Sequence, residues 1–366
     1  MSNYISLKST ILCGKFKNIV ISAYYIWRVI MKKSEICVLG GGSWGTALAQ
    51  ILASNGNEVD LWSIEEDVLN DIKNFGENKK YHPGFRLSSA IKPVSDLFQA
   101  TAGKSYIVIS LPSHIVRDIL KQLKGKLSTN CSLISTTKGI ENTSLKIISE
   151  IILDEYPDFD RSRIAALSGP SFAKEVMQNL PTAVSIASVN TELAKEVQKL
   201  FHNEKFRSYT TEDITGVELG GALKNVIAIA VGASDGCKMG HNARAALITR
   251  GAAEISRLGM AKGANPLTFL GLAGMGDLIL TCTSDLSRNR TVGVKIGEGK
   301  KLPDILKEMN QVVEGIKTAK SAYNLAKKLK VSMPITEQVY LMLYENKSPR
   351  DVLIDLTARN PKQEIY

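Results

Sequence analysis

The chain has 366 residues, 44% hydrophobic and 22% charged, which is long enough for two domains with separate cores. Its formal net charge is +10, but Lys8, Lys15, Lys17 and Arg28 contribute four charges within residues 1–30, leaving +6 (10 − 4) for the remainder. No Lys/Arg-rich block carries interleaved aromatic residues, so we expect no nucleic-acid partner, whereas a small anionic ligand suits the balance.

Residues 1–30 form a basic N-terminal extension. Its apolar stretch, Ile19 to Trp27, is short for a membrane span, and a second methionine, Met31, follows. A signal or transit peptide is one interpretation, but no small-residue cleavage site follows the stretch, which favours a disordered tail or an upstream start codon. We expect no stable membrane insertion.

From Met31 onward the pattern is strand, helix, strand. An apolar run enters the turn GGGSWG, helical spacing follows, and a second strand covers Glu58 to Trp62. Gly40, Gly42 and Gly45 satisfy GxGxxG in this turn. Such glycines permit a tight turn and close backbone approach, and the helix that follows offers free N–H groups to a pyrophosphate. The context predicts a dinucleotide site rather than a glycine-rich loop that binds nothing.

Further strand-like runs alternate with helical stretches, as a doubly wound α/β sheet requires. After Phe206 to Thr211 the character changes, and from about Ile214 the sequence predicts helices broken by glycine-rich and asparagine-rich turns. We therefore expect domains at 31–210 and 211–366. The runs predicted as strands are Tyr106–Leu111, Ser132–Ser135, Ile164–Leu167 and Ala183–Ala187.

Lys224 lies in the middle of ELGGALKNVIAIAVG, a run that is otherwise almost entirely small and apolar. An ammonium in a packed helix must find a partner, extend to water or lose its proton, and extension to water is the common outcome for an isolated lysine. Asp277 has the matching problem in GLAGMGDLILTC, with Thr281 four residues on and so on the same helical face. An ion pair between Lys224 and Asp277 would account for both buried charges.

Three other polar stretches stand out. Lys138 in STTKGIE follows a predicted strand and would face the ligand crevice, unless it is a solvated loop lysine. Ser171 in SGPSFAKE would either cap a helix or offer its hydroxyl to a substrate oxygen. In SDLSRNRTVG, a guanidinium beside hydroxyl and amide donors suits a phosphate, the alternative being an exposed polar loop. No cysteine or histidine spacing suggests a metal site, and the scattered cysteines suggest a reducing, cytoplasmic compartment.

With these residues in view, the chain resembles the NAD(P)-dependent sn-glycerol-3-phosphate dehydrogenases, soluble enzymes that reduce dihydroxyacetone phosphate. The resemblance runs from about Ser34 to Tyr344. It implies a Rossmann-like N-terminal domain, an all-helical C-terminal domain of the 6-phosphogluconate dehydrogenase type, a homodimer, and a role in supplying the glycerophospholipid backbone. The motifs that carry it are GGGSWGTALA, TTKGIE, SGPSFAKE, GVELGGALKNVIAIA, NARAALITRG, GLAGMGDLILTCTSDLSRNR, VVEG and MPITEQVY.

The resemblance also implies roles for individual residues. Catalysis falls on Lys224, with Asp277 and Lys138 beside it. Beyond the three fingerprint glycines, the implied cofactor contacts are Ser43, Trp44, Lys138, Ala173, Arg288, Val312 and Glu314. The implied substrate contacts are Lys138, Gly169, Ser171, Lys224, Asp277, Ser287, Arg288 and Asn289. Val312 is carried over with an ambiguity of one position, because Val313 is adjacent.

One stretch departs from the commoner bacterial pattern. Where many such enzymes carry Arg or His after the second strand, LWSIEED has Ile64 followed by Glu65 and Glu66. Acidic side chains repel a 2′-phosphate, so we expect NAD to be preferred, with NADP as the second cofactor.

Two alternatives stay open at this stage. A 3-hydroxyacid or 6-phosphogluconate-type dehydrogenase also uses a lysine, but the joint presence of Asp277 and Ser287-Arg288-Asn289 argues against it. A non-catalytic nucleotide-binding regulator would be free to lose Lys224 and Asp277, and both are present.

Overall fold

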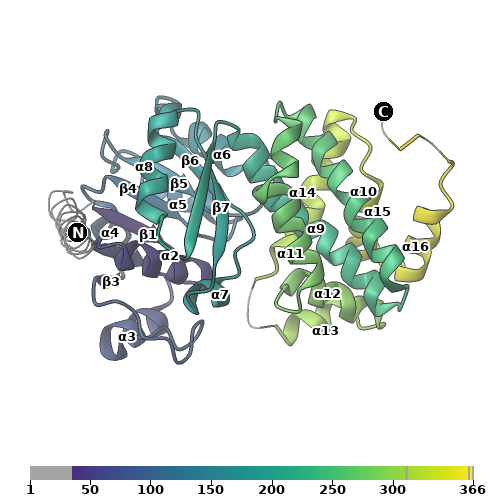
Figure 1. Ribbon diagram of the computed structural model, residues 1–366, viewed down its shortest axis with the longest axis horizontal. Coiled ribbons are helices and arrows are strands. Elements are labelled where there is room, and N and C mark those ends of the chain that lie inside the picture. The colour runs from purple at the N-terminus through teal and green to yellow at the C-terminus, as the bar shows by residue number, and fades with distance from the viewer. Residues whose placement is uncertain (1–34, 310–311, 362, 365–366) are drawn as a thin grey trace, which may run out of the picture.

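A computed structural model describes residues 35–309, 312–361 and 363–364. The expectations for residues 1–30 concern a segment outside these residues. The described chain forms two lobes side by side along its longest axis (Figure 1). The first contains a sheet covered by helices, and the second contains helices, with α9 (Ile214–Gly236) leading into it directly after the last strand.

The sheet has eight strands in the order β3-β2-β1-β4-β5-β6-β7-β8. The pairs from β3 to β6 are parallel, β6 pairs antiparallel with β7, and β7 pairs parallel with β8. The bounds are β1 (Ile36–Leu39), β2 (Val59–Trp62), β3 (Ile91–Val94), β4 (Tyr106–Ile109), β5 (Ser132–Ser135), β6 (Ile164–Ser168), β7 (Thr182–Ala187) and β8 (Phe206–Thr211).

Helices cover both faces of the sheet because its central strands are apolar on both sides. In β1, Ile36 and Val38 pack into one core, while Cys37 and Leu39 pack into the other. The helices of the first core include α2 (Ser43–Ser54), α3 (Glu66–Phe75) and α8 (Thr191–Phe201); those of the second include α4 (Leu97–Thr101), α5 (Val116–Gln122) and α6 (Ile148–Glu155). The predicted doubly wound α/β class is confirmed.

The two strands that the sequence did not predict are the edge strands, β3 and β8. An edge strand needs no continuous apolar run, since one of its sides is not paired. Pro93 within β3 weakens its strand signal further, as proline is tolerated only where no ladder hydrogen bond is needed. The antiparallel direction of β7 was also not foreseen.

In the helical lobe, α9 runs through the centre with nearly all its residues buried. Close packing against α12 requires glycine on both helices. A Cβ at Gly232 would lie 2.1 Å from the Arg290 carbonyl oxygen, and one at Gly293 would lie 2.2 Å from that of Ile229. The other elements are α10 (Gly240–Ala261), η2 (Pro266–Leu270), η3 (Leu272–Gly276), α11 (Asp277–Thr283), α12 (Arg288–Gly297), α13 (Leu302–Lys307), α14 (Glu314–Leu329), α15 (Pro334–Tyr344) and α16 (Pro349–Thr357).

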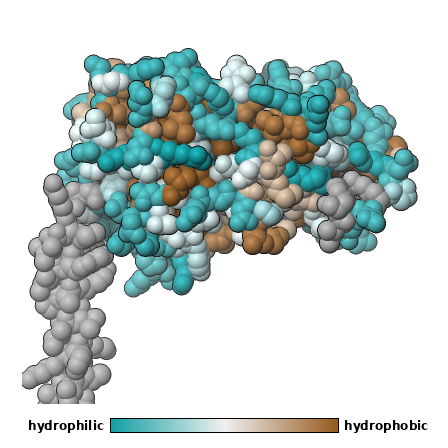
Figure 2. Space-filling view, turned by 90° about the horizontal axis from the view of Figure 1, so that it is seen from above, coloured by the Kyte–Doolittle hydropathy of each residue, from teal (hydrophilic) through white to brown (hydrophobic). Residues whose placement is uncertain are grey.

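Helix α9 is the one helix among the described residues that is long and apolar enough to cross a membrane, but 94% of its apolar window is buried inside the protein. It is therefore the core helix of its lobe. The face drawn in Figure 2 is largely hydrophilic, with hydrophobic side chains in small separate patches.

Candidate active site

The glycine turn joins β1 to α2 at the carboxyl edge of the sheet. Gly40 has φ +119°, and a Cβ there would lie 2.3 Å from the Ser110 carbonyl oxygen. A Cβ at Gly45 would lie 1.9 Å from the Gly40 carbonyl oxygen, so this glycine allows α2 to pack against the turn. At Gly42, by contrast, a Cβ would have no other described atom within 4 Å outside its chain neighbours.

The absence of a side chain at Gly42 is therefore not required by packing within the protein, and the space beside it is open. It precedes the first turn of α2, where no side chain caps the helix N-terminus. A pyrophosphate fits such a place, because free backbone N–H groups and the helix dipole both favour an anion. Trp44, in the first turn of α2, packs against the first core, and its buried Nε1 has no hydrogen-bond partner in the described part of the chain.

A segment that the sequence analysis did not select supports the turn. Buried Asn78 donates its amide to the Gly41 carbonyl at 2.9 Å and to the Thr46 hydroxyl at 2.8 Å. His82 Nε2 lies 2.8 Å from the Ser43 carbonyl oxygen and 3.3 Å from its hydroxyl. Burial lowers the pKa of His82, which keeps it neutral near pH 7. Ser43 is thus already paired with His82 through both groups.

The acidic stretch after β2 differs from its sequence interpretation. Ile64 is exposed, but the Glu65 carboxylate is not a free charge: it pairs with the Lys80 ammonium and accepts a 2.9 Å hydrogen bond from the Tyr81 hydroxyl. Lys80 also lies 3.3 Å from Asp67. Glu65 therefore contributes little repulsion toward a 2′-phosphate, and the expected preference for NAD depends more on Ile64 and Glu66.

The two lobes meet at a buried carboxylate held between two lysines. Lys224 Nζ on α9 lies 2.5 Å from Asp277 Oδ1 and 2.8 Å from the Thr281 hydroxyl. Lys138 Nζ, from the loop after β5, lies 2.7 Å from Asp277 Oδ2 and 3.2 Å from the Gly169 carbonyl oxygen. Asp277 is 1% exposed and begins α11. The sequence-predicted pairing of Lys224 with Asp277 is present, and Lys138 is the third member of the cluster.

This cluster has a specific electrostatic character. Burial is the main cause that lowers the pKa of Lys224 to about 8; the Asp277 carboxylate opposes the shift and the Lys138 ammonium adds to it. When both lysines are protonated, the group carries one excess positive charge beside a single carboxylate. A lysine in this setting exchanges a proton near neutral pH and attracts a negatively charged oxygen.

Around Gly169, one of the two roles left open for Ser171 is wrong. Helix α7 (Ala173–Met177) begins after Phe172, so Ser171 is not its N-cap. The Ser171 hydroxyl donates instead to the Gly169 carbonyl at 3.0 Å, beside the bond from Lys138. Helix α7, which begins at Ala173, also contacts α2, the helix that follows the glycine turn.

The Ser287-Arg288-Asn289 stretch is less open than its sequence suggests. Buried Ser287 caps α12 by accepting from the Arg290 N–H at 3.3 Å. Asn289 donates to Asn225 Oδ1 at 2.9 Å and accepts from the Gly315 N–H at 3.0 Å. The side chains of Ser287 and Asn289 thus already have partners within the protein.

Arg288 differs from its neighbours. It is exposed, and one of its N–H groups donates to the Val312 carbonyl oxygen at 2.8 Å. Glu314, at the start of α14, accepts from the Ser113 hydroxyl at 2.6 Å, and burial raises the pKa of its carboxyl group. Arg288 therefore retains donors for a ligand, with Val312 and Glu314 beside it.

Sequence reasoning missed Asn78, Lys80, His82 and Ser113. Ser113 had a usable signal, because it follows β4 and the sheet order reverses between β1 and β4, where ligands bind in open α/β sheets. The 78–82 segment had none, since it lies in a loop whose contacts with the glycine turn depend on tertiary structure. Within residues 35–309 and 312–361, no group of three or more His, Cys, Asp or Glu side chains is placed to hold a metal.

Comparisons with known proteins assign both lobes to one family. The family model for the NAD-dependent glycerol-3-phosphate dehydrogenase N-terminus matches residues 35–194, and the model for the C-terminus of the same family matches residues 213–354. Glycerol-3-phosphate dehydrogenase [NAD(P)+] from Syntrophotalea carbinolica is 51% identical over 331 residues, covering 90% of this chain and 99% of that protein. The Myxococcus xanthus protein of the same name is 50% identical over 328 residues, covering 90% and 98%.

Solved structures give the same result. Glycerol-3-phosphate dehydrogenase from Coxiella burnetii superposes with a TM-score of 0.85 at 40% identity, covering 88% of this chain and 98% of that one. The enzyme from Saccharomyces cerevisiae superposes with a TM-score of 0.77 at 28% identity, covering 90% and 100%. Both domain models match in order, and the relatives match over nearly their full length; the chain therefore belongs to the NAD-dependent glycerol-3-phosphate dehydrogenase family.

Proposed function

We propose that this chain catalyses the reversible reduction of dihydroxyacetone phosphate to sn-glycerol 3-phosphate with NADH or NADPH. The observation that carries the proposal is the buried Lys224–Asp277 pair with Lys138 on the other carboxylate oxygen. A non-catalytic nucleotide-binding protein has no need for this costly arrangement of charges. The name shared by the relatives supports the choice of substrate.

We assign dinucleotide binding to residues 31–210 and substrate binding and catalysis to residues 211–366. Gly40, Gly42 and Gly45 form the turn that would hold the pyrophosphate. When bound, the nicotinamide supplies the hydride that is added to carbon 2 of the substrate. The other residues proposed to contact the cofactor are Ser43, Trp44, Lys138, Ala173, Arg288, Val312 and Glu314.

Lys224 serves as the proton donor in the reductive direction. As carbon 2 is reduced, negative charge grows on its oxygen, and the Lys224 ammonium gives this oxygen a proton. Asp277 and Thr281 fix the ammonium in position, and in the oxidative direction neutral Lys224 removes the same proton. A pKa of about 8 suits both directions near neutral pH.

Arg288 binds the substrate phosphate. A guanidinium can form two parallel N–H bonds to phosphate oxygens, and only one of its donors is committed, to Val312. Ser287 and Asn289 act at this end of the site by fixing the first turn of α12, from which Arg288 projects. Gly169 and Ser171 complete the proposed substrate site, beside Lys138.

Three finer properties are part of the proposal. NAD is preferred over NADP, because Ile64 stands where a basic residue would meet the 2′-phosphate. The chain acts in the cytoplasm and forms a homodimer, as the resemblance implies. Light scattering of the purified chain measures the oligomeric state directly, and a monomer at assay concentrations would contradict the proposed homodimer.

The deciding experiment is to purify the chain and follow NADH oxidation with dihydroxyacetone phosphate. We expect saturable turnover that requires the phosphate group of the substrate. Turnover with a 3-hydroxyacid or 6-phosphogluconate in the oxidative direction, and none with dihydroxyacetone phosphate, would overturn the proposal.

A further inference from the structure

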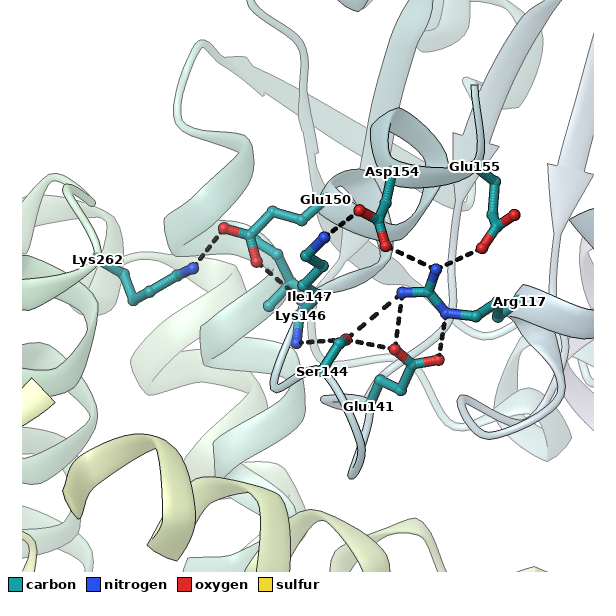
Figure 3. A network of polar contacts seen from close by, with 9 residues as sticks. All are labelled: Arg117, Glu141, Ser144, Lys146, Ile147, Glu150, Asp154, Glu155 and Lys262. Atoms are coloured by element: carbon teal, nitrogen blue, oxygen red, sulfur yellow. Dashed lines mark hydrogen bonds and ion pairs between the residues drawn. The ribbon is translucent and has the colours of Figure 1, made fainter. Parts of the chain in front are cut away.

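The loop between β5 and α6 brings Lys138 to the active site, and Arg117 anchors the middle of this loop at Glu141. Arg117, on α5, donates Nε and Nη2 to the two carboxylate oxygens of Glu141, both at 2.8 Å. Its Nη1 donates to Asp154 at 2.7 Å and to Glu155, both on α6 (Figure 3). One guanidinium therefore ties the loop to two helices through a bidentate pair, which is the most directional ion pair available to proteins.

The anchor is largely shielded from solvent. The side chains of Arg117, Glu141 and Glu155 are 17%, 10% and 11% exposed. Lys146 supplies the other positive charge through an ion pair with Asp154, so three carboxylates share two cations. The Arg117 guanidinium is the main cause that lowers the pKa of Glu141, so this carboxylate stays ionised. Without Arg117, three nearby negative charges would face Lys146 alone, and their repulsion would push the loop away from α6.

Helix α6 is itself fixed to the helical lobe. Glu218 on α9 accepts from the Ser149 N–H at 3.2 Å and from its hydroxyl at 2.5 Å. Lys262, which follows the end of α10, forms an ion pair with Glu150, the residue after Ser149 in α6 (Figure 3). Glu218 lies on the same helix as Lys224. A continuous set of polar contacts thus runs from the helix of Lys224, through α6 and Arg117, to the loop of Lys138.

This connection bears on the reaction because Lys138 and Lys224 must share one carboxylate. Two ammonium groups on Asp277 repel each other, so the position of Lys138 depends on how firmly its loop is held. On the strand side, the Thr137 hydroxyl donates to the Leu111 carbonyl at 2.8 Å. On the helix side, Glu141 is only three residues beyond Lys138, and Arg117 is its partner.

We propose that Arg117 is a positioning residue, which holds the 138–147 loop against α6 so that the Lys138 ammonium stays on Asp277. This inference rests on the proposed function. Its effect is expected in steps that depend on Lys138 and the substrate, since small displacements of reacting groups have large effects on rate.

The test compares Arg117→Gln and Arg117→Lys with Arg163→Gln. Arg163 is a matched control, because it also joins two segments of the sheet lobe: it precedes β6 and donates to Asn130 in the turn before β5, and these bonds do not involve the 138–147 loop. For Arg117→Gln we expect kcat/KM for dihydroxyacetone phosphate to fall by about tenfold or more, while KM for NADH changes less than about twofold. Arg117→Lys should recover only part of the loss, because an ammonium cannot form the bidentate pair. The Arg163 variant should match the wild type.

A pH profile separates positioning from general loss of stability. The Lys138 ammonium contributes to the lowered pKa of Lys224, and Asp277 is the carboxylate that opposes it. If the loop moves Lys138 away, the pKa of Lys224 rises, so the alkaline limb of kcat shifts to higher pH in Arg117→Gln. An enzyme that is only destabilised would have a lower kcat at every pH, and its alkaline limb would not shift.

Glu141→Gln is the second variant in case Arg117→Gln does not fold. It weakens only the loop side of the anchor, since Arg117 keeps Asp154 and Glu155. Unchanged substrate kinetics and an unshifted pH limb in the folded variant would overturn the inference. Wild-type turnover of dihydroxyacetone phosphate is measured first: its absence would refute the proposed function, whereas its presence with normal variants refutes only the role of Arg117.

Discussion

The two lobes contribute to the site by different physical means. Apart from Lys138, the sheet lobe offers backbone: three glycines shape a turn whose open side faces the N-terminus of α2. The helical lobe offers buried charge: Lys224 and Asp277 project from apolar helices. A ligand site built from backbone N–H groups is lost when a side chain fills its space. A site built from buried charges is lost when a charged group loses the partner that neutralises it. Substitutions in the two lobes should therefore fail in different ways.

The largest effect is expected at the buried charge. Lys224→Ala should lower kcat by at least about a hundredfold, the usual scale for a lost general acid, while NADH binding changes little. Steady-state kinetics with dihydroxyacetone phosphate and a fluorescence titration with NADH measure the two quantities. Near-normal turnover would end the assignment of Lys224 as proton donor.

Arg288→Ala should have the next largest effect. If its guanidinium holds the phosphate, the loss should raise KM for dihydroxyacetone phosphate by about tenfold or more and also lower kcat, because remote binding energy supports the reactive geometry. Arg288→Lys should recover part of it.

Dihydroxyacetone, which lacks the phosphate, is the control for this variant. The wild type should use it very poorly, and the penalty of Arg288→Ala should largely vanish with it. Equal losses with both substrates would mean that Arg288 serves the cofactor or the fold, for instance through its bond to Val312.

The pH dependence follows from the state of Lys224. If Lys224 is the proton donor, as proposed, reduction requires its protonated ammonium. Because its pKa is lowered to about 8, kcat in the reductive direction should then fall as pH rises through that value, approaching tenfold per pH unit. In the oxidative direction neutral Lys224 is required, so the profile should have the opposite slope. If kcat changed with pH in the same sense in both directions, a single acid–base lysine would be contradicted.

Some features of these two kinds of site could be predicted from the sequence, and others could not. Lys224 and Asp277 were predictable because each was an isolated charge in an apolar run, and only a partner could explain it. The glycine turn was predictable from spacing and context. The state of Glu65 was not, because its partners Lys80 and Tyr81 lie in a loop that no periodicity links to β2. The edge strands β3 and β8 escaped because pairing on one side needs no apolar run.

Two glycines of the turn separate packing from ligand binding. Gly45→Ala should destabilise the fold by about 1–3 kcal/mol, because its Cβ would collide with the Gly40 carbonyl oxygen. Gly42→Ala should leave the melting temperature unchanged, since its φ of −70° suits alanine and no described atom outside its chain neighbours lies within 4 Å of the added Cβ. It should still raise KM for NADH, by about tenfold, because the methyl group fills the space for the pyrophosphate. A stable Gly42→Ala enzyme with normal KM for NADH would place the pyrophosphate elsewhere.

The smallest effect concerns the choice between NADH and NADPH, where the site after β2 combines charge of both signs. We expect kcat/KM to favour NADH, and Ile64→Arg to move the ratio of kcat/KM values toward NADPH by adding a guanidinium where a 2′-phosphate would lie.

Lys80→Ala should move the same ratio toward NADH, because the Glu65 carboxylate loses its ion-pair partner and regains its full repulsion of a phosphate. Since the Glu65–Lys80 pair is partly exposed, both shifts should shrink as salt is raised. The assay is a competition of the two cofactors at fixed dihydroxyacetone phosphate. Lys92→Ala is the control, because Lys92 pairs with Glu58, which immediately precedes β2 at the end of the strand away from the turn. A wild-type preference for NADPH above about tenfold would contradict this account, since that is the discrimination a single charged contact of about 1.4 kcal/mol provides.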